Sequence, residues 1–177
     1  MIQQADDAGA DDVQPLDPQQ LGAYFVLREA VSLLEHQVEQ QLRADGDISY
    51  VQFTLLARLH HADGPLTMTQ LADGVVYSRS GLTYQAGLLE KAGLITRGAT
   101  PEDERATLVT ITDEGRALLE RVLPGHVQLS RRLLFDPLTD DDVRRLGDIM
   151  TRVRDHMRAQ PPRSAAPRKR RSSPKQD

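Results

Sequence analysis

The sequence predicts a mainly helical protein with one small β-hairpin near its middle. Three observations support this fold class. Apolar residues recur at spacings of three and four over most of the chain, as they do along one face of an amphipathic helix. The period changes to two only in the short, β-branched runs 94–97 and 107–111. Capping residues and glycines also stand where the helical runs begin and end.

Both ends of the chain differ in composition from its middle. Residues 1–20 carry five aspartates and no Lys or Arg, whereas 160–177 carry six basic residues and one aspartate. Neither stretch has enough apolar residues to form a core. We therefore expect a disordered acidic tail over 1–20, a folded domain over 21–158 and a disordered basic tail over 159–177.

The composition of the 177 residues excludes several classes of protein. The chain has no cysteine, which excludes disulfides, thiolate metal sites and cysteine nucleophiles. No apolar run is long enough to cross a bilayer, and no secretory signal precedes the domain, so we expect a cytoplasmic protein without a membrane partner. The net charge of −4 means that any nucleic-acid surface must depend on local positive charge rather than on the total.

The first part of the domain is predicted to form two helices. A long helix is expected over 21–42, with one apolar stripe: Tyr24, Leu27, Val31, Leu34 and Val38. A second helix is expected over 48–61 and should end in the polar stretch 62–65. Its inward residues are expected to be Val51, Leu55, Leu56 and Leu59.

Two more helices are predicted before the hairpin. Thr67 and Gln70 have the spacing of a capping box, which predicts a short helix through about Asp73. Ser78 can cap a further helix that runs to Lys91 or Ala92 and ends at Gly93 in a left-handed conformation. Its core-facing residues are expected to be Leu82, Leu88 and Leu89.

The hairpin and two further helices complete the domain. The strands 94–97 and 107–111 should flank a long polar tip. A helix over 112–135 is expected to begin at Thr112 and to be kinked by Pro124. A last helix over 139–158 is expected to begin at Thr139. Its apolar face is Val143, Leu146, Ile149 or Met150, Val153 and Met157.

This order of elements is that of a winged helix-turn-helix, with a DNA-binding lobe over about 48–111. The second helix of the pair presents short polar side chains, as a helix in a major groove requires. These residues are Arg79, Ser80, Thr83, Tyr84 and Gln85. At the hairpin tip, Arg105 can reach a phosphate or a narrow minor groove, and Asp103 can orient it. Arg97 is either a recognition residue or a solvated residue at the strand edge.

The residues of this lobe resemble the multiple-antibiotic-resistance regulator (MarR) family of bacterial transcription factors. The segments that carry the resemblance are SRSGLTYQAGLLEKAGLITR and PEDERATLVTITDEG. The flanking long helices fit the same pattern, so the resemblance covers roughly residues 20–158. It implies a homodimer, joined by the helices 21–42, 112–135 and 139–158, that binds pseudo-palindromic double-stranded DNA and is released by a small molecule.

The resemblance also assigns roles to individual residues. It matches Ser78 and Ser80 to the entry of the family's recognition helix, Arg79, Thr83, Tyr84 and Gln85 to positions that face DNA, and Asp103 and Arg105 to the wing. We also name Thr67, Thr69 and Arg97 as candidate DNA contacts. An effector pocket is expected near Tyr24, Tyr50 and His60. The chain departs from the family at Tyr84 and Glu104, where many members carry a basic residue, and at Gly87, where larger polar residues are common.

We therefore predict a sequence-specific transcriptional regulator, with repression favoured over activation. The alternative is a winged-helix module that binds a protein partner and no specific DNA, an interpretation that the acidic net charge supports. No catalytic triad, phosphate-binding loop or paired-carboxylate motif is present, so we expect neither an enzyme nor a cofactor. The five histidines lack spaced carboxylate or cysteine partners, and we expect no metal site.

Overall fold

The computed structural model describes residues 14–72, 79–99 and 107–159. Within these ranges the elements follow the order α1 (Pro18–Gly46), α2 (Tyr50–His61), β1 (Leu66–Thr67), α3 (Met68–Ala72), α4 (Arg79–Lys91), β2 (Ile95–Ala99), β3 (Thr107–Ile111), α5 (Asp113–Ser130), the π-helix η1 (Arg131–Phe135) and α6 (Asp140–Ala159). The predicted fold class, mainly helical with a small β wing, is confirmed. The chain divides into two compact units between Leu133 and Leu134.

The first helix is longer than predicted at both ends. Asp17 caps α1 by accepting a hydrogen bond from the backbone N–H of Gln20 at 2.8 Å, and the Gln20 side chain accepts one from the N–H of Asp17. Pro18 at the first helical position has the backbone angle that a helix needs. The prediction that the N-terminal tail extends to residue 20 is therefore wrong for residues 18–20. Residues 1–13 and 160–177 lie outside the described ranges.

The wing is part of a three-stranded antiparallel sheet in the order β1-β3-β2. Strands β2 and β3 pair from Ile95 opposite Ile111 to Ala99 opposite Thr107, as the hairpin prediction required. Strand β1 was not predicted: Leu66 and Thr67 pair with Val109 and Leu108 on the other edge of β3. Two residues are too few to show the alternation by which a strand is recognised in sequence.

The helix-turn-helix pair has the predicted helix boundaries where the structure describes them. Gln70 donates its backbone N–H to the Thr67 hydroxyl at 3.2 Å, and its side-chain Oε1 accepts the backbone N–H of Thr67 at 2.8 Å, so the capping box is confirmed. Helix α4 ends at Lys91, and Gly93, two residues later, has a φ of 75°, the left-handed conformation predicted for it. The backbone N–H groups of Gly93 and Leu94 donate hydrogen bonds to the carbonyls of Glu90 and Leu89, which caps this end of the helix.

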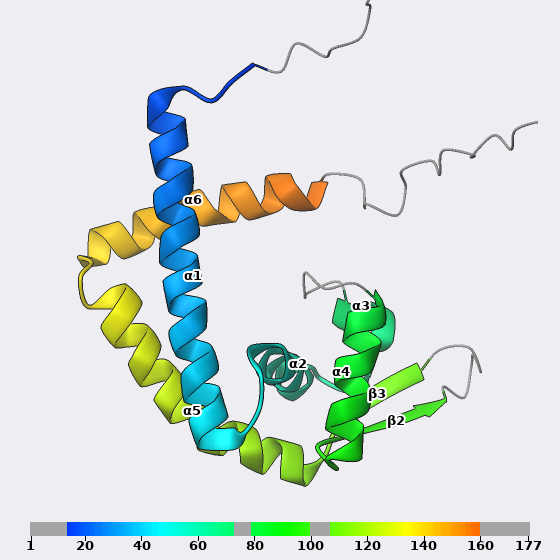
Figure 1. Cartoon of the computed structure of the whole chain (residues 1–177). Coiled ribbons are helices and arrows are strands. Elements are labelled where there is room, and N and C mark those ends of the chain that lie inside the picture. The colour runs from blue at the N-terminus through cyan, green and yellow to red at the C-terminus, as the bar shows by residue number, and fades with distance from the viewer. Residues whose placement is uncertain (1–13, 73–78, 100–106, 160–177) are drawn as a thin grey trace, which may run out of the picture. The chain divides into compact units, whose positions relative to one another are not determined.

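One hydrophobic core joins the helices and the sheet of the first unit. Its most buried side chains include Leu42, Leu55, Leu56, Leu71, Leu82, Leu89, Val109 and Val122. Helix α2 contacts α1, α4, α5 and β3, and α1 lies beside α5 (Figure 1). Two predictions about which helix residues are buried were wrong. Phe53 rather than Val51 is buried on α2, and Ala86 rather than Leu88 is buried on α4.

Helix α5 begins at Thr112, whose hydroxyl accepts the backbone N–H of Gly115 at 3.0 Å, as predicted. Pro124 lies inside α5, and the helix axis changes direction along its length (Figure 1). The helical path continues to Phe135, but its last five residues form a π-helix rather than an α-helix.

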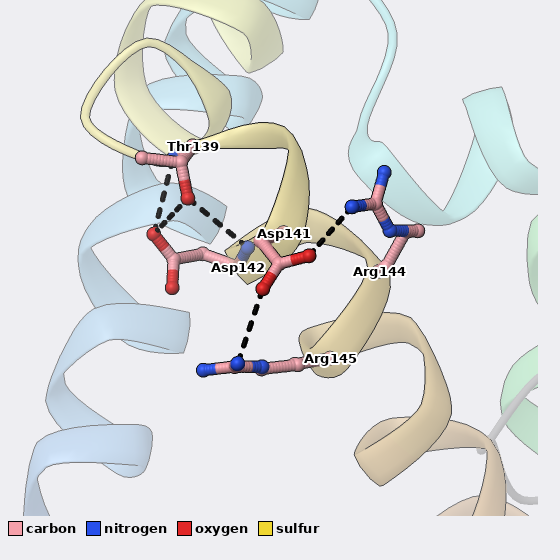
Figure 2. A network of polar contacts seen from close by, with 5 residues as sticks. All are labelled: Thr139, Asp141, Asp142, Arg144 and Arg145. Atoms are coloured by element: carbon pink, nitrogen blue, oxygen red, sulfur yellow. Dashed lines mark hydrogen bonds and ion pairs between the residues drawn. The ribbon is translucent and has the colours of Figure 1, made fainter.

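The second unit contains α6, which begins at a polar network on its first turn (Figure 2). The Asp142 carboxylate accepts hydrogen bonds from the Thr139 hydroxyl at 2.6 Å and from the Thr139 N–H at 3.1 Å. These hydrogen bonds lower the pKa of Asp142. Asp141 forms ion pairs with Arg144 and Arg145 at 2.5 and 3.1 Å. The predicted start of this helix at Thr139 is thereby confirmed.

Candidate nucleic-acid interface

Helix α4 presents one apolar face and one polar face. Leu82, Ala86 and Leu89 lie at intervals of four and three residues and are each 1% exposed, which fixes the face that packs on the core. Helical geometry then places Ser80 and Tyr84 near the centre of the opposite face. Both are exposed, and Tyr84 is 65% exposed. The helix therefore offers an aromatic and several hydroxyl groups to solvent on a rigid support.

The other predicted contact residues near α4 differ in their surroundings. Thr83 is exposed on one flank, and Arg79 is the first residue of the helix. Gln85 lies on the other flank and is half-buried, with its Oε1 atom buried and without a hydrogen-bond partner among the described residues. Ser78 lies outside the described residues. Sequence reasoning thus placed Ser80, Thr83 and Tyr84 on one accessible surface.

The two threonines at the start of α3 differ in their surroundings. The Thr67 hydroxyl and backbone N–H are both engaged with Gln70, and Thr67 also belongs to β1. Thr69 is exposed. Thr67 therefore stabilises the start of the helix-turn-helix, and Thr69 has the more accessible hydroxyl.

Arg97, on β2, forms an ion pair that the sequence analysis did not predict. Its Nε atom donates to the Oε2 atom of Glu90 at 2.8 Å, and its Nη2 atom donates to the same oxygen. The hydrogen bonds that Arg97 donates lower the pKa of Glu90, and the same hydrogen bonds raise the pKa of Arg97. Arg97 thus joins β2 to α4. The predicted wing residues Asp103 and Arg105 lie outside the described ranges.

Comparisons with known proteins place this geometry in a family. The model of the MarR family matches residues 47–106. Sco3205 of Streptomyces coelicolor, described as a MarR family transcriptional regulator in complex with DNA, is 34% identical with a TM-score of 0.79, over 86% of this chain and 94% of that one. The chain belongs to the MarR family. MarR-family proteins are transcriptional regulators that bind DNA, and they are not enzymes.

Two other relatives agree with the MarR assignment. AbsC, a MarR family transcriptional regulator of S. coelicolor, is 27% identical with a TM-score of 0.78, over 84% of this chain and all of AbsC. The HTH-type transcriptional regulator PecS of Dickeya dadantii is 30% identical over 72% of this chain and 77% of its own length. This MarR-family chain therefore matches its relatives over both the helix-turn-helix and much of the flanking helical structure.

The MarR-family chain also contains a groove beside α2. It has a volume of about 560 Å³ and is lined by side chains that include Tyr50, Phe53, Arg58, His61 and His126. The rings of Phe53 and His126 lie 4.6 Å apart between centroids. The Nε of Arg58 and the Nδ1 of His126 are buried without a hydrogen-bond partner among the described residues.

The predicted effector residues are only partly brought together. Tyr50 lines the groove beside α2, whereas Tyr24 and His60 are absent from its lining. Tyr24 is exposed on α1 beside Phe25, and the His60 ring contacts the His61 ring. The sequence analysis missed Phe53 and His126 because they are 73 residues apart and meet only through the packing of α2 on α5. Among the described residues, no helix has the length and apolar character needed to span a membrane.

Proposed function

We propose that this protein is a homodimeric, sequence-specific transcriptional regulator, and that it acts as a cytoplasmic repressor. The observation that carries the proposal is the rigid polar face of α4. Leu82, Ala86 and Leu89 hold the helix to the core, so Tyr84 and its neighbours stand at fixed positions on the outer face. A helix whose side chains are ordered in this way can read base edges in a major groove.

The proposed contacts come from the helix-turn-helix and the wing. Ser80 and Thr83 carry hydroxyls suited to phosphates and base edges, and Tyr84 adds a phenol and an aromatic ring. Arg79 and Gln85 on α4 and Thr69 on α3 are further proposed contacts. Ser78, Asp103 and Arg105 remain proposed contacts on the basis of sequence. A pseudo-palindromic site in double-stranded DNA follows from the proposed dimer, because two symmetric recognition helices meet two symmetric half-sites.

The proposed dimer is supported by apolar side chains that the chain itself leaves exposed. They lie on α1, at Tyr24, Phe25, Val26, Leu27, Val31 and Leu33, and on α6, at Ile149, Val153 and Met157. On α1, Tyr24, Leu27 and Val31 follow the helical spacing of three and four and so share one face, and an apolar face left exposed commonly marks a protein–protein interface. No buried residue is present on α6 itself. A second copy of the chain would cover these helices, as the closed symmetry of most homo-oligomers requires.

The groove beside α2 is the proposed effector site. Its aromatic side chains favour a planar ligand, and the guanidinium of Arg58 favours an anionic group. A small aromatic carboxylate combines the two. The groove lies between α2 of the DNA-binding lobe and α5, so a ligand with higher affinity for one arrangement of these helices would shift the protein toward it. Release of DNA follows if that arrangement no longer matches the operator.

Fluorescence anisotropy tests the proposed function. DNA from upstream of the protein's own gene and a scrambled duplex should be titrated across a salt series. Tight binding to the native sequence, with one dimer per site, is the expected result. Tyr84→Ala should weaken specific binding by roughly tenfold, whereas Thr54→Ala, in the groove beside α2 rather than on α4, should leave DNA binding without an effector unchanged. Equal and salt-sensitive binding to both duplexes would favour the protein-binding module instead.

The same assay tests the effector site. Aromatic carboxylates that release DNA from the native protein should lose their effect in Tyr50→Ala, while DNA affinity without the compound stays the same. A compound that acts equally on both proteins would place its site elsewhere.

A further inference from the structure

The inner face of the first wing strand carries one charged residue among apolar ones. Ile95 and Arg97 point to the same face of β2, because side chains alternate along a strand. Ile95 is buried, and Arg97 stands opposite the fully buried Val109 in the register of the sheet. The aliphatic part of Arg97 therefore continues the core, and its guanidinium emerges at the edge.

Helix α4 provides space and a charge for this guanidinium. A Cβ added at Gly87 would lie 3.9 Å from the Nη2 of Arg97, so the arginine passes over the part of α4 that has no side chain. One turn further along the helix, Glu90 accepts hydrogen bonds from both Nε and Nη2 of Arg97. Helical geometry places Thr83, Gly87 and Glu90 on the flank of α4 that faces β2.

This ion pair connects β2 to α4 beyond the turn that joins them. Strand β2 is an edge strand, since its pairing within the described sheet is with β3 alone. Its N-terminal end is held by the buried Ile95 and by the turn at Gly93 and Leu94. Arg97 lies further along the strand, nearer to the wing tip, and both partners are partly exposed, at 27% and 37% of their side-chain surface.

We propose that the Glu90–Arg97 pair is a positioning device that sets the wing strand β2 relative to the recognition helix α4, so that both reach DNA together. Arg97 is then a positioning residue and not a DNA contact, in place of the role that the sequence analysis gave it. The inference rests on the proposed function, in which α4 and the wing bind one operator. Gly87 is part of the device because a large side chain there would occupy the path of Arg97.

Two single substitutions distinguish positioning from direct contact. Arg97→Gln and Glu90→Gln both remove the pair, and each should weaken operator binding by about tenfold, the scale of one lost contact. Simple electrostatics predicts the opposite for Glu90→Gln, because removing a negative charge near DNA strengthens binding. Arg43→Gln removes an exposed pair with Glu39 on α1 and serves as the matched control, with unchanged affinity.

The salt dependence of binding and a charge-swapped double variant further distinguish positioning from direct phosphate contact. Both single variants should change the slope of log K against log salt by the same amount, because each acts through the position of the wing and not through a phosphate contact of its own. The double variant Glu90→Arg, Arg97→Glu should recover most of the lost affinity. A slope reduced by about 0.9 in Arg97→Gln, with Glu90→Gln binding as well as the native protein, would overturn the proposal by showing a direct phosphate contact. Unchanged binding in both variants would overturn it as well.

Hydrogen exchange on the free protein separates this inference from the proposed function. The amides of β2 should exchange faster in Arg97→Gln and Glu90→Gln than in the native protein, and at the native rate in the charge-swapped variant. If the native protein fails to prefer its operator, the proposed function fails while the exchange data still report on the pair. Native exchange rates in both single variants would show that the pair does not hold the strand.

Discussion

The carbonyl oxygen of Leu94 lies against the backbone of Gly115, only 2.2 Å from the position that a Cβ on residue 115 would take. The same carbonyl accepts the backbone N–H of Thr112 at 3.1 Å, and the Thr112 hydroxyl donates to the carbonyl of Gly93 at 2.8 Å. The end of the recognition helix is thereby joined to the start of α5. A change at this junction should therefore affect both the stability of the lobe and the orientation of α4.

Gly115→Ala should destabilise the protein strongly. The new Cβ would overlap a backbone carbonyl, which cannot rotate away as a flexible side chain can, and overpacking of this kind costs about 1–3 kcal/mol. Gly87→Ala is the matched helical control, because its Cβ would meet only a distant atom of Arg97 and should raise helix propensity. Urea denaturation measures both. Equal stabilities for the two variants would contradict the close approach seen at Gly115.

The stability of the protein should fall as the pH is lowered through the range below about 6.5. Burial lowers the pKa of His126 below its usual value of 6.5. The unfolded chain therefore binds a proton more readily than the folded one, so stability is full above pH 6.5 and decreases as the pH falls toward the folded pKa. Thermal unfolding of the native protein and of His126→Gln between pH 8 and 5 measures this contribution. A slope equally steep in the variant would assign the pH dependence to other groups.

Charge introduced on the exposed face of α1 should separate the proposed dimer. Leu27 and Val31 are 43% and 39% exposed in the single chain, and both belong to the apolar stripe of this helix. Replacing both with Lys should raise the dimer dissociation constant by at least about 100-fold, because the symmetric dimer loses the burial of four side chains, two from each protomer, and full burial of each contributes about 1.5 kcal/mol or more. Sedimentation velocity measures the change. Glu29→Lys, on the same helix, should sediment as the native protein does.

Loss of the cap at Thr139 should loosen the start of α6. Thr139→Ala removes the hydroxyl that bonds the Asp142 carboxylate and accepts the Asp142 N–H at 3.3 Å, and loss of such a cap costs about 1 kcal/mol. Faster hydrogen exchange confined to the first turn of α6 is the expected result, and Thr139→Ser should restore protection. Unchanged exchange in Thr139→Ala would show that Asp142 and its neighbours hold the helix start without the hydroxyl.

The capping signals were predicted well because their partners lie close together in sequence. Thr67 with Gln70, Thr112 with Gly115 and Thr139 with Asp142 are each three residues apart, and the backbone geometry of a helix start requires this spacing. The capping box at Asp17 obeys the same rule, but the polar composition around it led to the prediction of a tail. Composition over twenty residues thus outweighed a local signal that was present.

The buried faces of the helices were predicted less well. Leu88 is a large apolar residue of the kind found in protein cores, yet it is 37% exposed. The buried face of α4 is formed by Leu82, Ala86 and Leu89 instead. A small residue such as Ala86 gives a weak apolar signal, so the sequence alone favoured the larger leucine. The contacts of α4 with α2 and the sheet select between the two.

The residues alone were enough to establish the order of helices, the hairpin and the family resemblance, since each depends on short-range periodicity, caps and a contiguous motif. Tertiary packing decided the rest. It pairs β1 with β3, about forty residues away, and places Arg97 beside Glu90. It also brings the backbone of Gly115 against the Leu94 carbonyl and the ring of Phe53 against that of His126. These contacts depend on how helices and strands meet in space, and no spacing along the chain specifies which side chains will face one another there.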